Sequence, residues 1–177
     1  MRTGLRIIFL ACTAGLTSVA GAVNLPPGLA GWEDWVLQGH EFRRCPFFAT
    51  SMPGEASSHR CAWPEPLTLT VDAHGGAFSQ RWLVYADSWA SLPGDLTHWP
   101  EDVRINGAAA PVVARDGMPA VRLGPGTHAL SGRFAWEARP EALPIAAETG
   151  IVELTVDGRT VSQPERPNGG SRAGFRP

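Results

Sequence analysis

From residue 67 onward, apolar and polar residues alternate along the chain, which is the period of two typical of half-buried β-strands. In the first such run, Leu67, Leu69 and Val71 alternate with polar residues. Runs that predict strands occur at 67–71, 78–86, 103–105, 111–114, 121–123, 128–136 and 151–156. The pattern therefore predicts a series of short strands that bury one face.

Glycine-containing pairs separate these runs and predict tight turns. The pairs are Gly75-Gly76, Asn106-Gly107, Asp116-Gly117 and Asp157-Gly158. Asn-Gly supplies the two positive φ angles of a type I′ turn, so 103–105 and 111–114 are predicted to form a hairpin. Short strands joined by such turns are typical of an antiparallel β-sandwich or jelly roll. The predicted fold class is mostly β, with one short N-terminal helix.

That helix is predicted from a different period near the N-terminus. Leu29, Trp32 and Val36 recur at i, i+3 and i+7, which is typical of a short amphipathic helix. Trp32 and Trp35 are expected to dock it on the strands. The remaining segments lack periodic apolar residues and are predicted as loops, at 42–66 and 87–102, and as a disordered tail, at 163–177.

The first 22 residues have the three regions of a secretory signal peptide. Arg2 and Arg6 precede an apolar run, which ends at the small residues Ala20-Gly21-Ala22. We predict cleavage after Ala22, export to the periplasm or cell envelope, and a β-sandwich domain over residues 23–162. No later stretch approaches the roughly 20 apolar residues of a membrane-spanning helix, so we expect no transmembrane span after cleavage.

Composition narrows the classes of function. The 177-residue chain contains no lysine and has a formal net charge of −2, so it offers no basic surface to nucleic acid. Glycine and proline number 20 and 16, in keeping with many turns. No glycine-rich loop leads into a helix, so the sequence predicts no nucleotide or other cofactor.

Two cysteines, Cys45 and Cys61, remain after the predicted cleavage. An even pair in an exported chain favours a disulfide, because the compartment is oxidising. The rival hypothesis is a metal site in which His40, Cys45, His59 and Cys61 supply the nitrogen and sulfur ligands that zinc prefers. The disulfide is favoured, because a zinc signature has two close pairs of ligands and His40 is loosely spaced from Cys45.

Few combinations of residues would support catalysis. Asp72 and His74 are two apart on a predicted strand, where a carboxylate can orient an imidazole, but no G-x-S-x-G motif supplies a nucleophile. Glu33, Asp34 and Glu41 could form the carboxylate pair of a glycoside hydrolase. Solvated charges are the favoured interpretation, and a hydrolase acting on cell-envelope carbohydrate is the alternative function.

Seven tryptophans favour a binding role instead. Trp89 and Trp99 fall in the predicted loop 87–102, and Asp87 precedes the first of them. Exposed aromatic rings beside carboxylates bind sugars and also anchor protein interfaces. Asp87, Trp89 and Trp99 are therefore the predicted ligand-binding residues. The competing interpretation is that the loop folds back and buries both rings. Burial is favoured for either tryptophan considered by itself, but the loop remains the best candidate for a binding site.

Three segments resemble known proteins. They are Trp32–Leu37 running into Arg43–Pro46, Val103–Gly107, and Gly126–Trp136. Over most of residues 23–161 the sequence resembles the N-terminal region of large, uncharacterised proteobacterial envelope proteins. This resemblance implies no activity and no catalytic residues, and it would make the chain the leading part of something longer. The last two segments are also similar to strand pairs of jelly-roll carbohydrate-binding modules.

The sequence thus predicts an exported, non-catalytic binding or interaction domain of the cell envelope. Its expected partner is a carbohydrate, peptidoglycan included, or an envelope protein. An enzyme would show a cleft with close titratable side chains, whereas a sugar binder would expose the ring of Trp89 or Trp99.

Overall fold

The computed structural model describes residues 26–47, 56–165 and 172–175. The chain divides into two units, residues 1–36 and 37–177. The predicted signal peptide lies outside the described residues. Within the described part of the chain, no helix is long and apolar enough to cross a membrane.

The first unit contains the predicted helix as two short turns, the 3-10 helix η1 (Ala30–Trp32) and the α-helix α1 (Glu33–Val36). The rings of Trp32 and Trp35 meet edge to face, with centroids 5.8 Å apart, and both rings are exposed. The helix lies in the first unit, and its predicted membership of one domain with the strands stays a prediction. Its docking on the strands stays a prediction.

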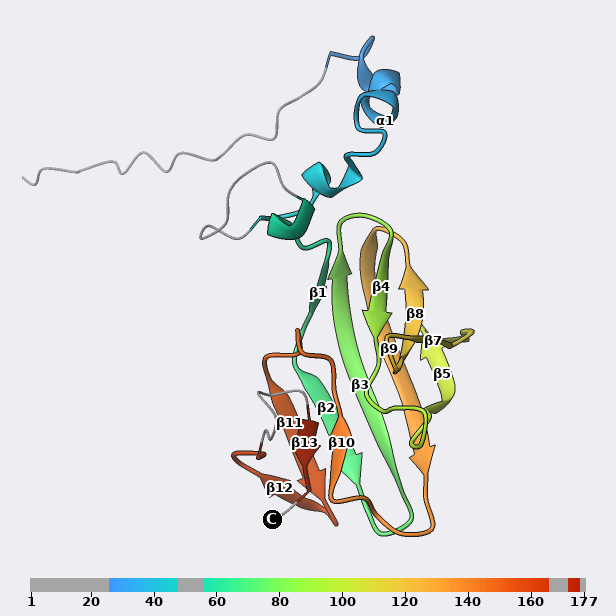
Figure 1. The fold of residues 1–177 in the computed structure, drawn as a ribbon, viewed down its shortest axis with the longest axis vertical. Helices are drawn as coiled ribbons and strands as arrows, with labels where there is room; N and C mark the ends of the chain where they lie inside the picture. The colour runs from blue at the N-terminus through green and yellow to red at the C-terminus, as the bar shows by residue number, and fades with distance from the viewer. Residues whose placement is uncertain (1–25, 48–55, 166–171, 176–177) are drawn as a thin grey trace, which may run out of the picture. The chain divides into compact units, whose positions relative to one another are not determined.

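The regular structure of the second unit is almost all β-strand, so the predicted mostly β, sandwich-like fold is confirmed (Figure 1). Two short 3-10 helices, η2 (Glu41–Arg44) and η3 (Ala56–Ser58), precede the strands. The strands are β1 (Ala62–Pro64), β2 (Leu67–Val71), β3 (Gly75–Val84), β4 (Ser88–Ser91), β5 (Glu101–Ile105), β6 (Ala108–Ala109), β7 (Val113–Arg115), β8 (Met118–Leu123), β9 (Gly126–Ala135), β10 (Ala142–Pro144), β11 (Val152–Val156), β12 (Arg159–Val161) and β13 (Arg172–Gly174).

The strands form two layers. The large sheet has the order β12-β11-β2-β3-β9-β5-β6, and β1 pairs with β3 beyond the end of β2. Its pairs are antiparallel except for β11 with β2. The second layer consists of the small sheets β4-β8-β7 and β10-β13. They are joined where the backbone N–H of Gly94 donates to the carbonyl of Pro144 at 2.8 Å.

Alternation along the strands separates the core face of the large sheet from its outer face. On β3, Phe78, Gln80, Trp82 and Val84 are buried, and the residues that alternate with them are exposed. Burial of one such apolar side chain contributes about 1.5–3 kcal/mol to folding. The core cluster joins Leu67, Leu69, Leu130 and Leu154 of the large sheet to Ala90, Val121, Leu143 and Ala173 of the second layer.

Gln80 is the polar exception on the core face of β3, with only 4% of its surface exposed. Its Nε2 donates to the carbonyl of Glu65 at 2.9 Å and to Thr149 Oγ1 at 3.3 Å. Its Oε1 accepts a hydrogen bond from Trp82 Nε1 at 3.2 Å. Glu65 and Pro66 connect β1 to β2, so this buried amide supplies a side-chain hydrogen bond at the junction of the two strands.

Three of the four predicted glycine turns are present. The fourth is wrong, because Gly75-Gly76 begins β3 and the chain turns just before it. In the other three pairs both residues have a positive φ angle. The angles are 51° and 85° in Asn106-Gly107, 51° and 78° in Asp116-Gly117, and 49° and 78° in Asp157-Gly158. These turns join β5 to β6, β7 to β8 and β11 to β12. The predicted hairpin of 103–105 with 111–114 is wrong, because β5 pairs with the two-residue β6, and β7 turns away to pair with β8.

Three segments predicted as irregular contain strands. The predicted loop 42–66 includes β1, and the predicted loop 87–102 includes β4, which pairs with β8. The predicted disordered tail includes β13, which pairs with β10; Ala173 of this strand and Phe175 just after it are buried in the core. Each of these strands has three or four residues, which is too short for an alternating pattern to emerge.

The predicted disulfide is confirmed. Cys45 and Cys61 are bonded, with their Cα atoms 4.7 Å apart, and Cys45 is buried. The bond ties the end of η2 to the start of β1 and closes the intervening loop.

We expect replacement of both cysteines by serine to lower the free energy of unfolding by about 3 kcal/mol, because the denatured chain regains the entropy of an open loop. Urea unfolding of the oxidised protein and of the double variant measures the difference. Dithiothreitol should destabilise the original protein by a similar amount and leave the variant unchanged. An equal response of both proteins to dithiothreitol would contradict this expectation.

Gly132 allows close packing on the core face of β9. A Cβ at this position would lie 2.6 Å from Phe78 Cε1 and 3.2 Å from Val103 Cγ2. We expect Gly132→Ala to lower the free energy of unfolding by about 1–3 kcal/mol, because the Phe78 ring must shift in a filled core. Gly150→Ala, where no atom lies within 4 Å, is the control and should cost less than about 0.5 kcal/mol. Equal effects in urea unfolding would contradict the packing argument.

Candidate functional site

The outer face of the large sheet carries small and charged side chains in register. Residues paired across the strands on this face form transverse rows. One row consists of Glu153 on β11, Thr68 on β2, Ser79 on β3, Ser131 on β9 and Arg104 on β5. At the usual strand spacing, this row of five strands spans roughly 19 Å. Hydroxyl groups occupy its middle, with an acid at one end and a guanidinium at the other.

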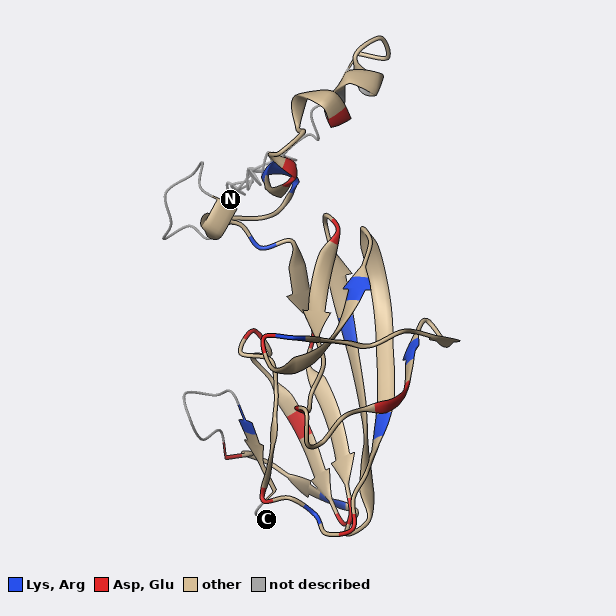
Figure 2. Cartoon of the chain, turned by 45° about the vertical axis from the view of Figure 1, so that its right-hand side comes forward, with Lys and Arg blue, Asp and Glu red and all other residues tan. Residues whose placement is uncertain are grey.

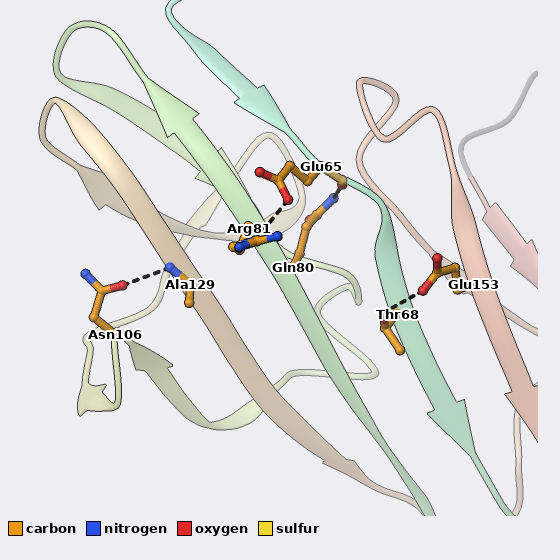
Figure 3. Close-up of polar contacts among 7 residues, drawn as sticks. All are labelled: Glu65, Thr68, Gln80, Arg81, Asn106, Ala129 and Glu153. Carbon is orange, nitrogen blue, oxygen red and sulfur yellow. Dashed lines mark hydrogen bonds and ion pairs between the residues drawn. The ribbon is translucent and has the colours of Figure 1, made fainter.

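The first depression on this face has a volume of about 480 Å³. Arg81 Nε donates to Glu65 Oε2 at 2.9 Å on one side, and Thr68 Oγ1 donates to Glu153 Oε2 at 3.1 Å on the other (Figure 3). Its lining residues are Glu65, Pro66, Thr68, Ser79, Gln80, Arg81, Ala129, Leu130 and Glu153. The depression is therefore bordered by polar groups that already hold one another in place.

The second depression has a volume of about 400 Å³ and lies over β9 and β5. Arg133 donates to Asp102 at its border, and Arg104 Nη1 donates to the Gly107 carbonyl at 2.9 Å. The hydrogen bond from Arg133, together with its charge, lowers the pKa of Asp102, and the same bond raises the pKa of Arg133. This second depression thus also has an ion pair at its edge.

The register of β5 shifts between Glu101 and Arg104, and Asp102 adopts a φ of 49° at this bulge. A β-bulge redirects the side chains next to it. At this bulge, the carboxylate of Asp102 lies against the guanidinium of Arg133. Basic and acidic positions are interspersed over the strands of the second unit rather than segregated (Figure 2).

The three predicted ligand-binding residues have different surroundings in the structure. Asp87 Oδ2 accepts a hydrogen bond from Arg122 Nη2 at 3.2 Å, and Arg122 lies directly opposite Trp89 in the pairing of β4 with β8. The Trp89 side chain is 38% exposed, and the guanidinium of Arg115 lies 5.0 Å from its ring centroid. Trp99 is half-buried in the loop after β4. Ligand binding by these residues stays a prediction.

Trp89 borders a third depression of about 480 Å³ at the end of the disulfide loop. Its lining residues are Ser57, His59, Arg60, Cys61, Ala62, Trp82, Ser88, Trp89, Arg115 and Glu148. Neither Trp99 nor Asp87 is among these lining residues.

The residues considered for catalysis have structural contacts. Asp72 Oδ1 accepts from the backbone N–H groups of His74 and Gly75, at 2.8 and 2.9 Å, and these bonds lower its pKa. Its carboxylate therefore closes the turn between β2 and β3 and does not orient the His74 imidazole. Glu41 Oε1 likewise accepts from the backbone N–H of Gly39 at 2.9 Å.

The alternative metal site does not form. The Cys45 and Cys61 sulfurs bond to each other, so neither is available as a thiolate ligand. The rings of His40 and His59 each pack against Phe42, with centroids 5.8 and 5.1 Å away. Among the described residues, no group of three or more His, Cys, Asp or Glu side chains has a metal-binding arrangement.

No protein-family model and no curated protein matches the sequence. Among solved structures, the chain is similar to the M1 zinc metallopeptidase from Deinococcus radiodurans, at 16% identity and a TM-score of 0.36. A mutant of that peptidase gives 19% identity and a TM-score of 0.35. In both cases the match covers 66% of this chain and 39% of the peptidase, so the chain spans well under half the length of these structures. A similarity of this degree does not extend to activity.

The outer face was not predicted as a site from the sequence. The signal that could have indicated it is the kind of residue between the buried positions of the two longest strands. Four of those positions carry the small residues Ala77, Ser79, Ala129 and Ser131, while Arg81, Leu83 and Arg133 occupy others. Exposed strand faces usually carry longer side chains or β-branched residues, so a small-residue floor leaves room for another molecule.

The loop between β4 and β5 is held by Asp95, whose Oδ1 accepts from the backbone N–H of Thr97 at 2.9 Å and of His98 at 2.7 Å. Burial raises the pKa of Asp95, but these hydrogen bonds and the His98 side chain together lower it below its ordinary value. The ionised form therefore stabilises the fold above about pH 4, and that contribution disappears as the pH falls through the lowered pKa.

We expect the stability advantage of the original protein over Asp95→Asn to shrink between pH 6 and pH 3, because only the aspartate loses its charge. Urea unfolding at each pH measures this difference. An advantage that is unchanged over this range would show that the charge of Asp95 does not stabilise the loop.

Proposed function

We propose that this protein is an exported, non-catalytic binding domain of the cell envelope that holds carbohydrate on the outer face of its large sheet. The observation that carries the proposal is a floor of small side chains bordered by two ion pairs, Arg81 with Glu65 and Arg133 with Asp102. Export itself is supported by the signal-peptide pattern of residues 1–22.

The polar groups on this face suit a ligand rich in hydroxyl groups. Charged donors and acceptors form the stronger hydrogen bonds, and a guanidinium presents several donors in a fixed plane. Arg81 is 64% exposed, and its partner Glu65 is 44% exposed, so both retain groups that face solvent. A sugar hydroxyl can accept from the first and donate to the second.

An apolar end to the face adds a second feature typical of sugar sites. Leu83 on β3 lies opposite Trp63 on β1, one row beyond Arg81, and Tyr85 lies two residues further along the chain, just after β3. Leu83 and Tyr85 are each 39% exposed. The apolar side of a sugar ring packs on such groups while its hydroxyls bind the polar ones.

A protein partner fits this face less well. The core of a protein interface is usually built around aromatic or other large anchors. The middle rows here carry Thr68, Ser79 and Ser131 instead, so they offer many polar contacts and little apolar area.

Binding is favoured over hydrolysis by the state of the carboxyl groups. A glycoside hydrolase needs a carboxylic acid whose pKa is raised so that it can donate a proton. Each described carboxyl group whose pKa is shifted has it lowered, namely Glu41, Asp72, Asp95 and Asp102.

We expect Arg81→Ala to weaken carbohydrate binding by about tenfold or more, since a lost charge-assisted hydrogen bond is worth roughly 1.5–3 kcal/mol. Affinity electrophoresis through a panel of soluble polysaccharides and calorimetry on the positive members measure binding. A reducing-end assay on the same samples should show no turnover.

Arg122→Ala is the matched control, because Arg122 also forms an exposed ion pair, with Asp87, but on the second layer. Both substitutions should change stability by less than about 1 kcal/mol. Equal losses of binding in the two variants would place the ligand elsewhere, and release of reducing ends would make the protein a hydrolase.

A further inference from the structure

We infer that the outer face has two adjoining subsites and binds an uncharged oligosaccharide chain across the strands, rather than a single sugar. This inference rests on the proposed function and specifies its ligand. It follows from the register of β3 with β9, from the position of the two depressions, and from the balance of charge between them.

The two depressions are neighbours on one surface. Ser79 lines the first and Ser131 lines the second, and these residues lie directly opposite each other in the pairing of β3 with β9. Directly opposed residues have Cβ atoms roughly 4.5–5.5 Å apart. Two short hydroxymethyl side chains therefore lie where the depressions meet, and a chain can pass over them from one depression to the other.

Each depression has its own arginine–carboxylate pair. Arg81 with Glu65 borders the first, and Arg133 with Asp102 borders the second. Ala129 lies opposite Arg81, and Ala77 lies opposite Arg133, so a small side chain lies opposite each guanidinium. The two subsites thus repeat one arrangement, which suits a ligand that repeats one chemical unit.

The charges of this face indicate an uncharged ligand. The residues that line the two depressions include three arginines, Arg81, Arg104 and Arg133, and three carboxylates, Glu65, Asp102 and Glu153. A further carboxylate, Glu101, lies directly opposite Arg133. Two of the three arginines are already paired with a carboxylate. An anionic or cationic polymer would gain no net attraction from such a surface, whereas hydroxyl groups can bond to both members of each pair.

The test compares chain lengths on the full chain. Chito- and cello-oligosaccharides of one, two and four units are titrated by calorimetry into the original protein, Arg81→Ala, Arg133→Ala and the control Arg122→Ala. In the original protein, the four-unit chain should bind at least about tenfold more tightly than the single sugar, because the second contact is intramolecular. Either face variant should lose this advantage, and Arg122→Ala should keep it.

The alternative outcomes are distinct. Equal affinity for one and four units, with Arg81 still required, would overturn the two-subsite inference and leave the proposed function standing. If Arg81→Ala weakens binding of the four-unit chain and Arg133→Ala does not, the two-subsite inference is likewise overturned and the proposed function stands. Oligogalacturonate serves as the anionic comparison. If it binds more tightly than the uncharged chains and salt weakens its binding, the inference that the ligand is uncharged is overturned. No binding to any saccharide of the series would overturn both proposals, and thermal unfolding of each variant confirms that it is folded.

Discussion

The pairing of β3 with β9 is the interaction on which the rest of the structure depends. The two strands pair over ten residues, and every other strand of the large sheet attaches to one of them directly or through a neighbour. Because side chains alternate between the faces of a strand, this register places Trp82 and Leu130 in the core and Ser79 and Ser131 on the outer face. A slip of one residue would exchange the two sets, so the core and the candidate site are specified together.

The junction of β1 and β2 couples the two faces more closely. Glu65 contributes its carbonyl to the buried amide of Gln80 and its carboxylate to the exposed guanidinium of Arg81. Gln80 in turn accepts from the indole of Trp82, so its removal would leave a buried donor without a partner. One buried hydrogen-bond network thus fixes the backbone from which the first ion pair of the outer face extends (Figure 3).

Local patterns predicted the fold well because strands and tight turns are encoded over a few residues. The alternation in 67–71 and the Asn-Gly pair at 106 specify their structures without distant partners. The candidate binding sites could not be predicted in the same way, because they depend on contacts between residues far apart in the sequence. Trp89 was predicted from its ring alone, whereas the guanidinium of Arg115 lies over that ring. The row across the outer face depends on the parallel pairing of β11 with β2, which joins segments more than 80 residues apart.

Asp102 gives an independent reason to assign a role to the outer face. Of the described non-glycine residues with positive φ, three are in turns directly before glycine, and Asp102 alone lies within a strand. A left-handed residue outside a turn costs about 1 kcal/mol or more, and such strain concentrates at functional sites. The ion pair with Arg133 is exposed on both sides and offsets little of that cost. The bulge therefore places a strained residue with a carboxylate beside the second depression, which agrees with the binding role proposed for the outer face.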